Sequence, residues 1–227
     1  MVTRFPARHK VPEFTVFTSL LRMTTKYGFP DVRETLIEDL KGAYPTKWEN
    51  FETAKVLGED VFGSPKPHPN AVLNLLLEQR IKFALPFAAY QAAMGGFSAL
   101  IGNDPDEILP RFTLASIIHG IERIRHVVVQ VSHSIVYNGN LRVCPQSACV
   151  LGVGVTPIEE RMEALKKVFA IMVDKSKGDL LSPVSFGNLV CVDCAKLLEG
   201  AHLRCRESVW VALPSLLGAV RAGKVVD

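Results

Sequence analysis

The sequence predicts a mainly α-helical protein with helical hairpins, a long central helix and a C-terminal segment that resembles a zinc knuckle. Hydrophobic residues make up 48% of its 227 residues, enough for a substantial core. Apolar residues recur at three- and four-residue spacings along most of the chain, whereas strand patterns are few and short. Four of the five cysteines stand in two close pairs.

Two short helices are expected near the N-terminus. The first follows Pro12 and Glu13 and ends at Gly28, and the second follows at once and ends near Gly42. Together they predict a helical hairpin. Their apolar positions are Phe14, Phe17, Leu20 and Leu21 in the first helix and Val32, Leu36, Ile37 and Leu40 in the second.

The segment 43–69 is rich in proline and has few periodic apolar positions, so we expect a surface excursion there. A central helical core is expected over 70–138. It begins with two helices over 71–80 and 82–94, which the Gly95-Gly96 dipeptide is expected to end.

The longest periodic pattern follows Asp104, a helix-capping residue, and Pro105 at a first helical position. The β-branched run "HVVVQV" is more typical of a strand, but helical spacing over about 20 residues predicts a helix. The periodic positions are Leu114, Ile117, Ile118, Ile121, Ile124, Val128, Val131 and Ile135.

Two more helices are expected after this one. Thr156 and Glu159 form a capping-box pattern before the first. The last helix is expected to begin near Cys191, to bury Trp210 on its inner face and to end at Pro214.

Composition excludes several classes of protein. The formal net charge is only +3, from 26 basic and 23 acidic residues, and the basic residues are scattered, so no nucleic-acid partner is expected. The N-terminus lacks the apolar run of a signal peptide, and no stretch approaches the roughly 18 apolar residues of a membrane span. We expect a cytoplasmic and/or nuclear protein whose thiols stay reduced.

The cysteine pairs predict a structural zinc site. Cys144 and Cys149 form C-x4-C, and Cys191 and Cys194 form C-x2-C. Two such pairs can place four thiolates at the corners of a tetrahedron, the closed geometry of structural zinc. The second pair stands at an expected helix N-terminus, where the positive end of the helix dipole stabilises thiolates.

Alternatives to this ligand set stay open. Cys205 or His202 could replace one ligand, although His202 lies about 12 Å beyond Cys194 along a helix axis. The cysteines could also be buried apolar side chains that bind nothing. A thioredoxin-like redox pair is disfavoured because no βαβ pattern surrounds the C-x2-C motif.

The order of several motifs resembles a known family. They are "SLLRMTTKYGFPDVRETLIEDL", "YPTKWENFE", "AVLNLLLEQRIKFALPFAAY", "IIHGIERIRHVVVQVSHSIV", the two cysteine pairs and "RESVWVALPSLLG". This order is similar to the region C-terminal to the BTB core in BTB-domain-containing proteins of mushroom-forming (basidiomycete) fungi. The family's closing motif is matched by Arg206, Trp210, Leu213 and Pro214.

The resemblance implies a protein-interaction role, as an adaptor or regulator. Family members carry a BTB fold upstream, which is not expected in this sequence, so the usual BTB dimer and cullin-binding surfaces are expected to be missing. The expected organisation begins with a helical hairpin resembling the end of a BTB domain over 1–42 and the surface excursion over 43–69. The helical core over 70–138, a zinc-stapled segment over 139–218 and a tail over 219–227 follow.

Two functions are therefore expected as alternatives. The first is a non-enzymatic intracellular scaffold that binds a protein partner and holds structural zinc. The second is an enzyme for a small molecule, with its pocket among the central helices around residues 90–126. A sizeable pocket lined by convergent polar groups would favour the enzyme.

Overall fold

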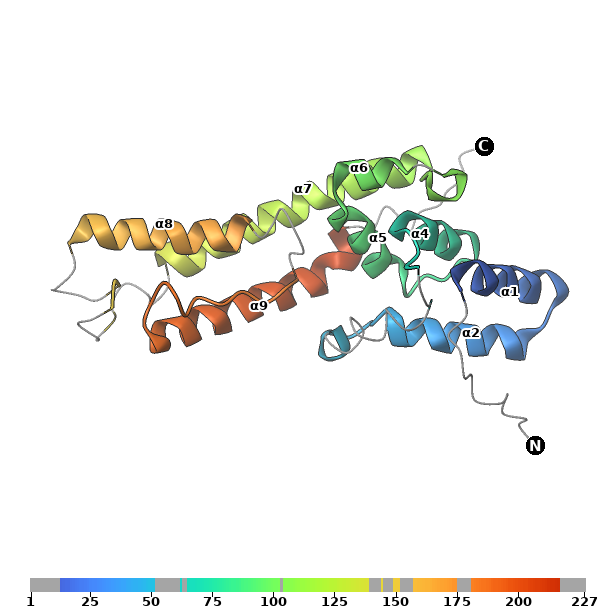
Figure 1. The fold of residues 1–227 in the computed structure, drawn as a ribbon, viewed down its shortest axis with the longest axis horizontal. Coiled ribbons are helices and arrows are strands. Elements are labelled where there is room, and N and C mark those ends of the chain that lie inside the picture. The colour runs from blue at the N-terminus through green and yellow to red at the C-terminus, as the bar shows by residue number, and fades with distance from the viewer. Residues whose placement is uncertain are drawn as a thin grey trace, which may run out of the picture. The chain divides into compact units, whose positions relative to one another are not determined.

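The computed structural model describes residues 13–51, 62, 65–102, 104–138, 144, 149–151, 157–174 and 181–216. The regular elements among them are helical, which confirms the mainly α fold (Figure 1). None of these helices is long and apolar enough to cross a bilayer. In chain order they are α1 (Phe14–Tyr27), α2 (Pro30–Ala43), η1 (Trp48–Asn50), α4 (Pro69–Glu78), α5 (Leu85–Met94), α6 (Gly96–Ile101), η2 (Pro105–Glu107), α7 (Arg111–His133), η3 (Ser134–Asn138), α8 (Ile158–Asp174) and α9 (Val192–Leu216).

The chain divides into two compact units, with the boundary inside α7. Unit 1 consists of Met1–Ile117 with Leu217–Asp227, and unit 2 consists of Ile118–Leu216. The finer division into five segments stays a prediction.

The predicted hairpin opens unit 1. At its turn, Gly28 ends α1 in the left-handed conformation at φ 69°, which favours glycine, and its N–H donates to the carbonyl of Thr24. Pro30 then starts α2 at a position where its missing N–H costs no helical hydrogen bond. The completely buried side chains of the hairpin are Phe17, Leu21, Leu36 and Leu40.

The Pro-rich segment after the hairpin contributes to the core of unit 1. Tyr44, Phe51 and Phe62 are buried. The ring of Phe62 meets that of Phe17 edge to face at 5.3 Å, and Phe51 meets Phe87 in the same way at 5.7 Å. These aromatic side chains bury a large apolar area against distant helices, so the segment is not only a surface excursion.

The first helices of the central core follow the prediction, and a further short helix comes directly after them. The first two begin and end close to the predicted bounds, as α4 and α5. The Gly95-Gly96 dipeptide ends α5 as predicted, with Gly95 as its C-cap residue, and a further helix, α6, starts directly at Gly96. Gly96 has φ 82°, a conformation that lets the chain change direction between α5 and α6.

The capping residues at Asp104 begin a short turn and not the long helix. Glu107 N donates to Asp104 O at 2.9 Å, and Asp104 N donates to Glu107 Oε2 at 3.4 Å, which closes η2. The long helix α7 starts only at Arg111 and continues into the π-helical turn η3. The helical interpretation of the β-branched run is confirmed.

Asn70 joins the start of α4 to α6 and to η2. Its side chain is completely buried, and the two N–H groups of its Nδ2 are shared among the carbonyls of Ala99, Leu100 and Glu107, whose oxygens lie 2.9, 3.1 and 3.0 Å from Nδ2. These bonds hold η2 against the start of α4. No periodic pattern singles out this residue in the sequence.

We expect Asn70→Ala to destabilise the protein by about 1–3 kcal/mol, because buried carbonyls would lose their donor. Asn74→Ala is the matched control, since Asn74 also donates to two carbonyls, those of Asp106 and Ile108, but at a more exposed position where water can replace it. Urea unfolding followed by circular dichroism measures both. Equal losses for the two variants would contradict the role assigned to Asn70.

Unit 2 is built from the rest of α7, η3, α8, α9 and the segment before α9. Figure 1 shows α8 and α9 beside the end of α7. Pro214 does not end α9, which reaches Leu216, because a proline in the last turn removes only one helical donor. The predicted cap at Thr156 lies outside the described residues. The buried side chains of this core are Val136, Cys144, Cys149, Leu151, Leu165, Val168, Met172, Val184, Phe186, Val190, Cys194, Ala195 and Leu198.

Candidate metal centre

The C-x2-C pair stands at the start of α9. Cys191 directly precedes the helix and its carbonyl accepts from Ala195 N at 2.8 Å, so Cys191 occupies the N-cap position. Cys194 lies in the first turn, three residues on. The spacing therefore places both sulfurs at the N-terminal end of α9, where the helix dipole favours negative charge.

The C-x4-C pair is brought together by a bend of the chain between α7 and α8. Cys144 N donates to Leu151 O at 3.4 Å, so the chain returns on itself just after Cys149. Both cysteines are buried. The intervening residues 145–148 lie outside the described part of the chain.

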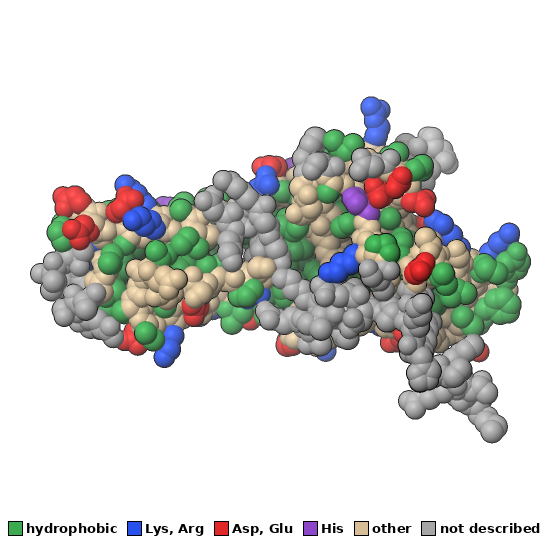
Figure 2. Space-filling view, in the orientation of Figure 1, with side chains coloured by type: hydrophobic (Ala, Val, Ile, Leu, Met, Phe, Trp, Pro, Cys, Tyr) green, Lys and Arg blue, Asp and Glu red, His purple; other side chains and the backbone are tan. Residues whose placement is uncertain are grey.

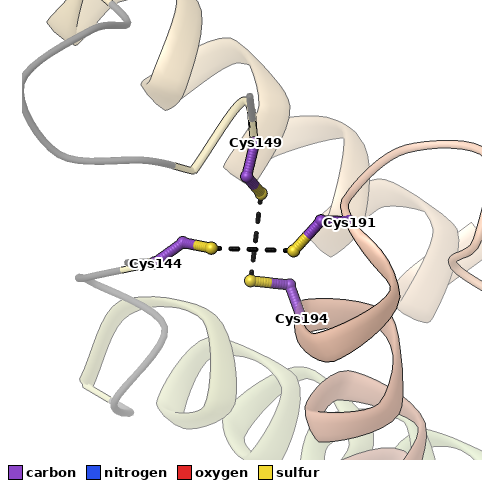
Figure 3. Close-up of side chains that lie close together, drawn as sticks. All are labelled: Cys144, Cys149, Cys191 and Cys194. Atoms are coloured by element: carbon purple, nitrogen blue, oxygen red, sulfur yellow. Dashed lines mark hydrogen bonds between the residues drawn. The ribbon is translucent and has the colours of Figure 1, made fainter. Parts of the chain in front are cut away.

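The two pairs converge. All four sulfurs lie within 4.8 Å of one another, with 3.6 Å between Cys144 and Cys191 and 3.9 Å between Cys149 and Cys194. Figure 3 shows the four side chains pointing at a common centre. Four sulfurs bound tetrahedrally at about 2.3 Å from a zinc ion would be about 3.8 Å apart, close to both distances.

The same distances argue against a disulfide. Bonded sulfurs lie about 2.05 Å apart, and all five cysteines of the chain are free. They also argue against apolar packing as the whole explanation, because unrelated core cysteines have no reason to turn four sulfurs towards one point. The donor set fits one soft or borderline metal ion.

The surroundings of the four sulfurs are apolar on most sides. Cys144, Cys149 and Cys194 are buried in the core of unit 2, and Cys191 is half-buried. Leu151 and Val190 belong to the same core. Such a shell limits the access of water to the sulfurs and would slow the exchange of a bound ion with the solvent.

The metal-free thiols differ in acidity. The N–H of Cys194 donates to the sulfur of Cys191, and this lowers the pKa of Cys191 to about 7. Burial raises the pKa of Cys194 above that of a free thiol. Burial thus opposes the ionisation of Cys194, and a cation at the centre of the four sulfurs would stabilise its thiolate.

The two predicted substitute ligands are not part of the group of four. His202 is buried, with its ring edge to face on Phe186 at 6.4 Å between ring centres. Cys205 is also buried, and burial raises its pKa to about 11. Both follow the first turns of α9, and the helical rise of about 1.5 Å per residue carries them away from the cysteine pairs.

A groove in unit 1 was not found by sequence reasoning. It is lined by residues of α1, α4 and η2 and by the segment before α4. Only Asp104 and the η2 residues fall in the range 90–126, so this groove is not the pocket among the central helices that the enzyme alternative predicted. An ion pair in its lining joins Arg22 to Glu78, 56 positions apart, and no local pattern could have revealed it.

The chain matches no protein-family model, and no curated protein or solved structure is significantly similar to it.

Proposed function

We propose that this chain is a non-enzymatic protein-interaction or scaffold protein whose second unit is stapled by a structural zinc ion. The observation that carries the proposal is the closed donor set of Cys144, Cys149, Cys191 and Cys194. Four protein sulfurs complete a tetrahedron and leave no position for water or substrate, which is the pattern of structural zinc sites. Catalytic zinc sites keep one position open.

Zinc is the ion that this donor set favours. Thiolates prefer soft or borderline ions, and a tetrahedral set of four sulfurs is typical of zinc or of iron–sulfur chemistry. The distances of 3.6 and 3.9 Å between sulfurs suit a single small ion at the centre. A cytoplasmic or nuclear location, where thiols stay reduced, is consistent with this proposal.

We propose that the chain binds its partner as an adaptor or regulatory protein. It is supported by the resemblance of the motif order, including Arg206 and Trp210, to the region after the BTB core of the fungal proteins. Affinity capture of the intact protein, with mass spectrometry of what it retains, tests this role. Recovery of no specific partner under several conditions would count against it.

We expect the purified, reduced protein to contain about one zinc per chain, measured by elemental analysis. Cys191→Ser combined with Cys194→Ser should abolish zinc binding, because serine does not replace a thiolate donor. Cys205→Ala is the matched control: Cys205 is a buried cysteine of the same helix outside the cluster, and its loss should leave zinc in place.

Two results would contradict this assignment. One is the absence of any metal from freshly purified protein. The other is equal loss of zinc in the Cys205→Ala variant while its helical circular dichroism remains, since that would separate zinc binding from the four-cysteine cluster. Iron or copper in place of zinc would keep the site but correct the identity of its ion.

A further inference from the structure

The groove of unit 1 encloses about 840 Å³ between α1, the segment before α4, α4 and η2. Its apolar lining includes Phe14, Ala71 and Leu75, and Pro65 and Pro67 form part of one wall. This volume lies within the range of about 300–1,000 Å³ that is typical of sites for small ligands and peptide segments. All lining residues belong to one compact unit.

The groove is acidic in a chain that is basic overall. The only basic side chains in its lining besides His68 are Arg22 and Lys66, whereas the chain carries a net charge of +3. Figure 2 shows acidic side chains gathered over the part of unit 1 around α4. The acidic residues in the lining are Glu13, Glu78, Asp104, Asp106 and Glu107.

Arg22 shows how the groove holds a cation. Its guanidinium donates to both oxygens of Glu78, at 2.9 Å from Nε to Oε1 and 2.7 Å from Nη2 to Oε2, so α1 and α4 are joined across the groove. Glu78, and more weakly Asp106, raise the pKa of Arg22. One cation therefore pairs with Glu78, and the carboxylates of Asp104 and Asp106 line the same groove.

A second observation concerns Thr18, which lines the groove from α1. Its side chain is only 8% exposed, and its hydroxyl has no hydrogen-bond partner among the described residues. A buried hydroxyl without a partner is costly. A ligand group that reached it would remove this cost.

A metal ion does not fit this lining. Within the part of the chain that the structure describes, only the four cysteines bring three or more metal-ligating groups together, so the carboxylates of the groove are too dispersed to share an ion. Phosphate-bearing ligands, including nucleic acid and lipid head groups, would be repelled by the excess of carboxylates. A lysine or arginine side chain suits this lining, as the pairing of Arg22 with Glu78 shows.

We propose that this groove binds an extended basic segment of a partner protein, with lysine or arginine side chains on Asp104 and Asp106 and an apolar side chain on Phe14 and Ala71. The inference rests on the proposed role as a protein-interaction protein and names the chemistry of its partner. Charge complementarity selects the partner, and the apolar lining adds affinity through burial.

The test measures fluorescence anisotropy of a labelled, amidated eight-residue peptide that carries two lysines, two arginines and two leucines, titrated with the full chain. We expect saturable binding that weakens as salt rises. The double variant Asp104→Asn, Asp106→Asn should bind roughly fivefold more weakly, as expected for the loss of two partly exposed ion pairs. Peptides with glutamine for the basic residues, or serine for leucine, should also bind more weakly.

Glu34→Gln is the matched control, because it removes an exposed carboxylate of α2 outside the groove and should leave binding unchanged. Circular dichroism and zinc content of each variant, measured on the same samples, confirm that the fold is kept. No binding at millimolar protein, equal binding by the double variant, or an equal loss in Glu34→Gln would each overturn the proposal. If the peptide does not bind but those samples still contain zinc, the groove proposal is wrong and the zinc assignment stands.

Discussion

Removal of zinc by a chelator is expected to make unit 2 susceptible to protease while unit 1 stays protected. Zinc that binds only the folded state adds its binding free energy to folding, and apparent values of about 10–16 kcal/mol are typical of small zinc modules. All five cysteines lie in unit 2, so this contribution is confined to Ile118–Leu216. Unit 1 buries its helices without any cysteine.

The core of unit 2 explains why the loss of zinc should destabilise residues beyond the cysteine cluster. The buried side chains of Cys144, Cys149 and Cys194 belong to the same core as Phe186 and Leu198, so released thiols would disturb the packing of α9. A small core supports little stability without such a staple. The segment before α9 depends on that helix as well, because Arg206 Nε donates to Leu181 O at 2.6 Å.

Limited proteolysis with and without chelator, with mass spectrometry of the fragments, measures this difference. The Cys191→Ser, Cys194→Ser variant should give the chelated pattern with no chelator present, and added zinc should restore protection only in the wild-type protein. Cuts spread evenly over both units, or no change in either, would contradict the confinement of the metal contribution to unit 2.

Helical periodicity was enough to predict most elements of the fold. It identified α1, α2 and α7 because their apolar faces repeat over at least two turns. It could not identify Phe51 and Phe62 as core residues, since their burial depends on distant rings. Helix boundaries were less predictable, because glycines and capping residues indicate a turn but do not indicate whether a new helix follows it.

The cysteine cluster was the most predictable part of the candidate site. Spacing alone indicated which four side chains belong together, because C-x4-C and C-x2-C each bring two sulfurs to one end of a turn. The groove could not be predicted, since its charges come from segments far apart in the chain. The sequence indicated only a capping role for Asp104, and only the fold places Asp104 and Asp106 in the same groove as Arg22.

Trp210→Ala is expected to destabilise unit 2 by about 3–5 kcal/mol, the usual cost of removing a packed aromatic side chain. The burial predicted from the sequence is confirmed: Trp210 is 8% exposed and Leu213 is 2% exposed. Val211→Ala is the matched control on the same helix, because Val211 is 77% exposed and its truncation should change the free energy of unfolding by less than about 0.5 kcal/mol.

Urea unfolding followed by circular dichroism measures both losses without depending on the deleted fluorophore. Fluorescence then tests the burial itself. The chain has two tryptophans, so Trp48→Phe leaves Trp210 as the reporter, and phenylalanine can keep the stacking of residue 48 on Phe51, whose ring centre lies 5.3 Å away. A blue-shifted emission maximum that moves to longer wavelength in urea is expected. A solvent-exposed maximum in the native protein, or equal losses for Trp210→Ala and Val211→Ala, would show that Trp210 does not anchor α9.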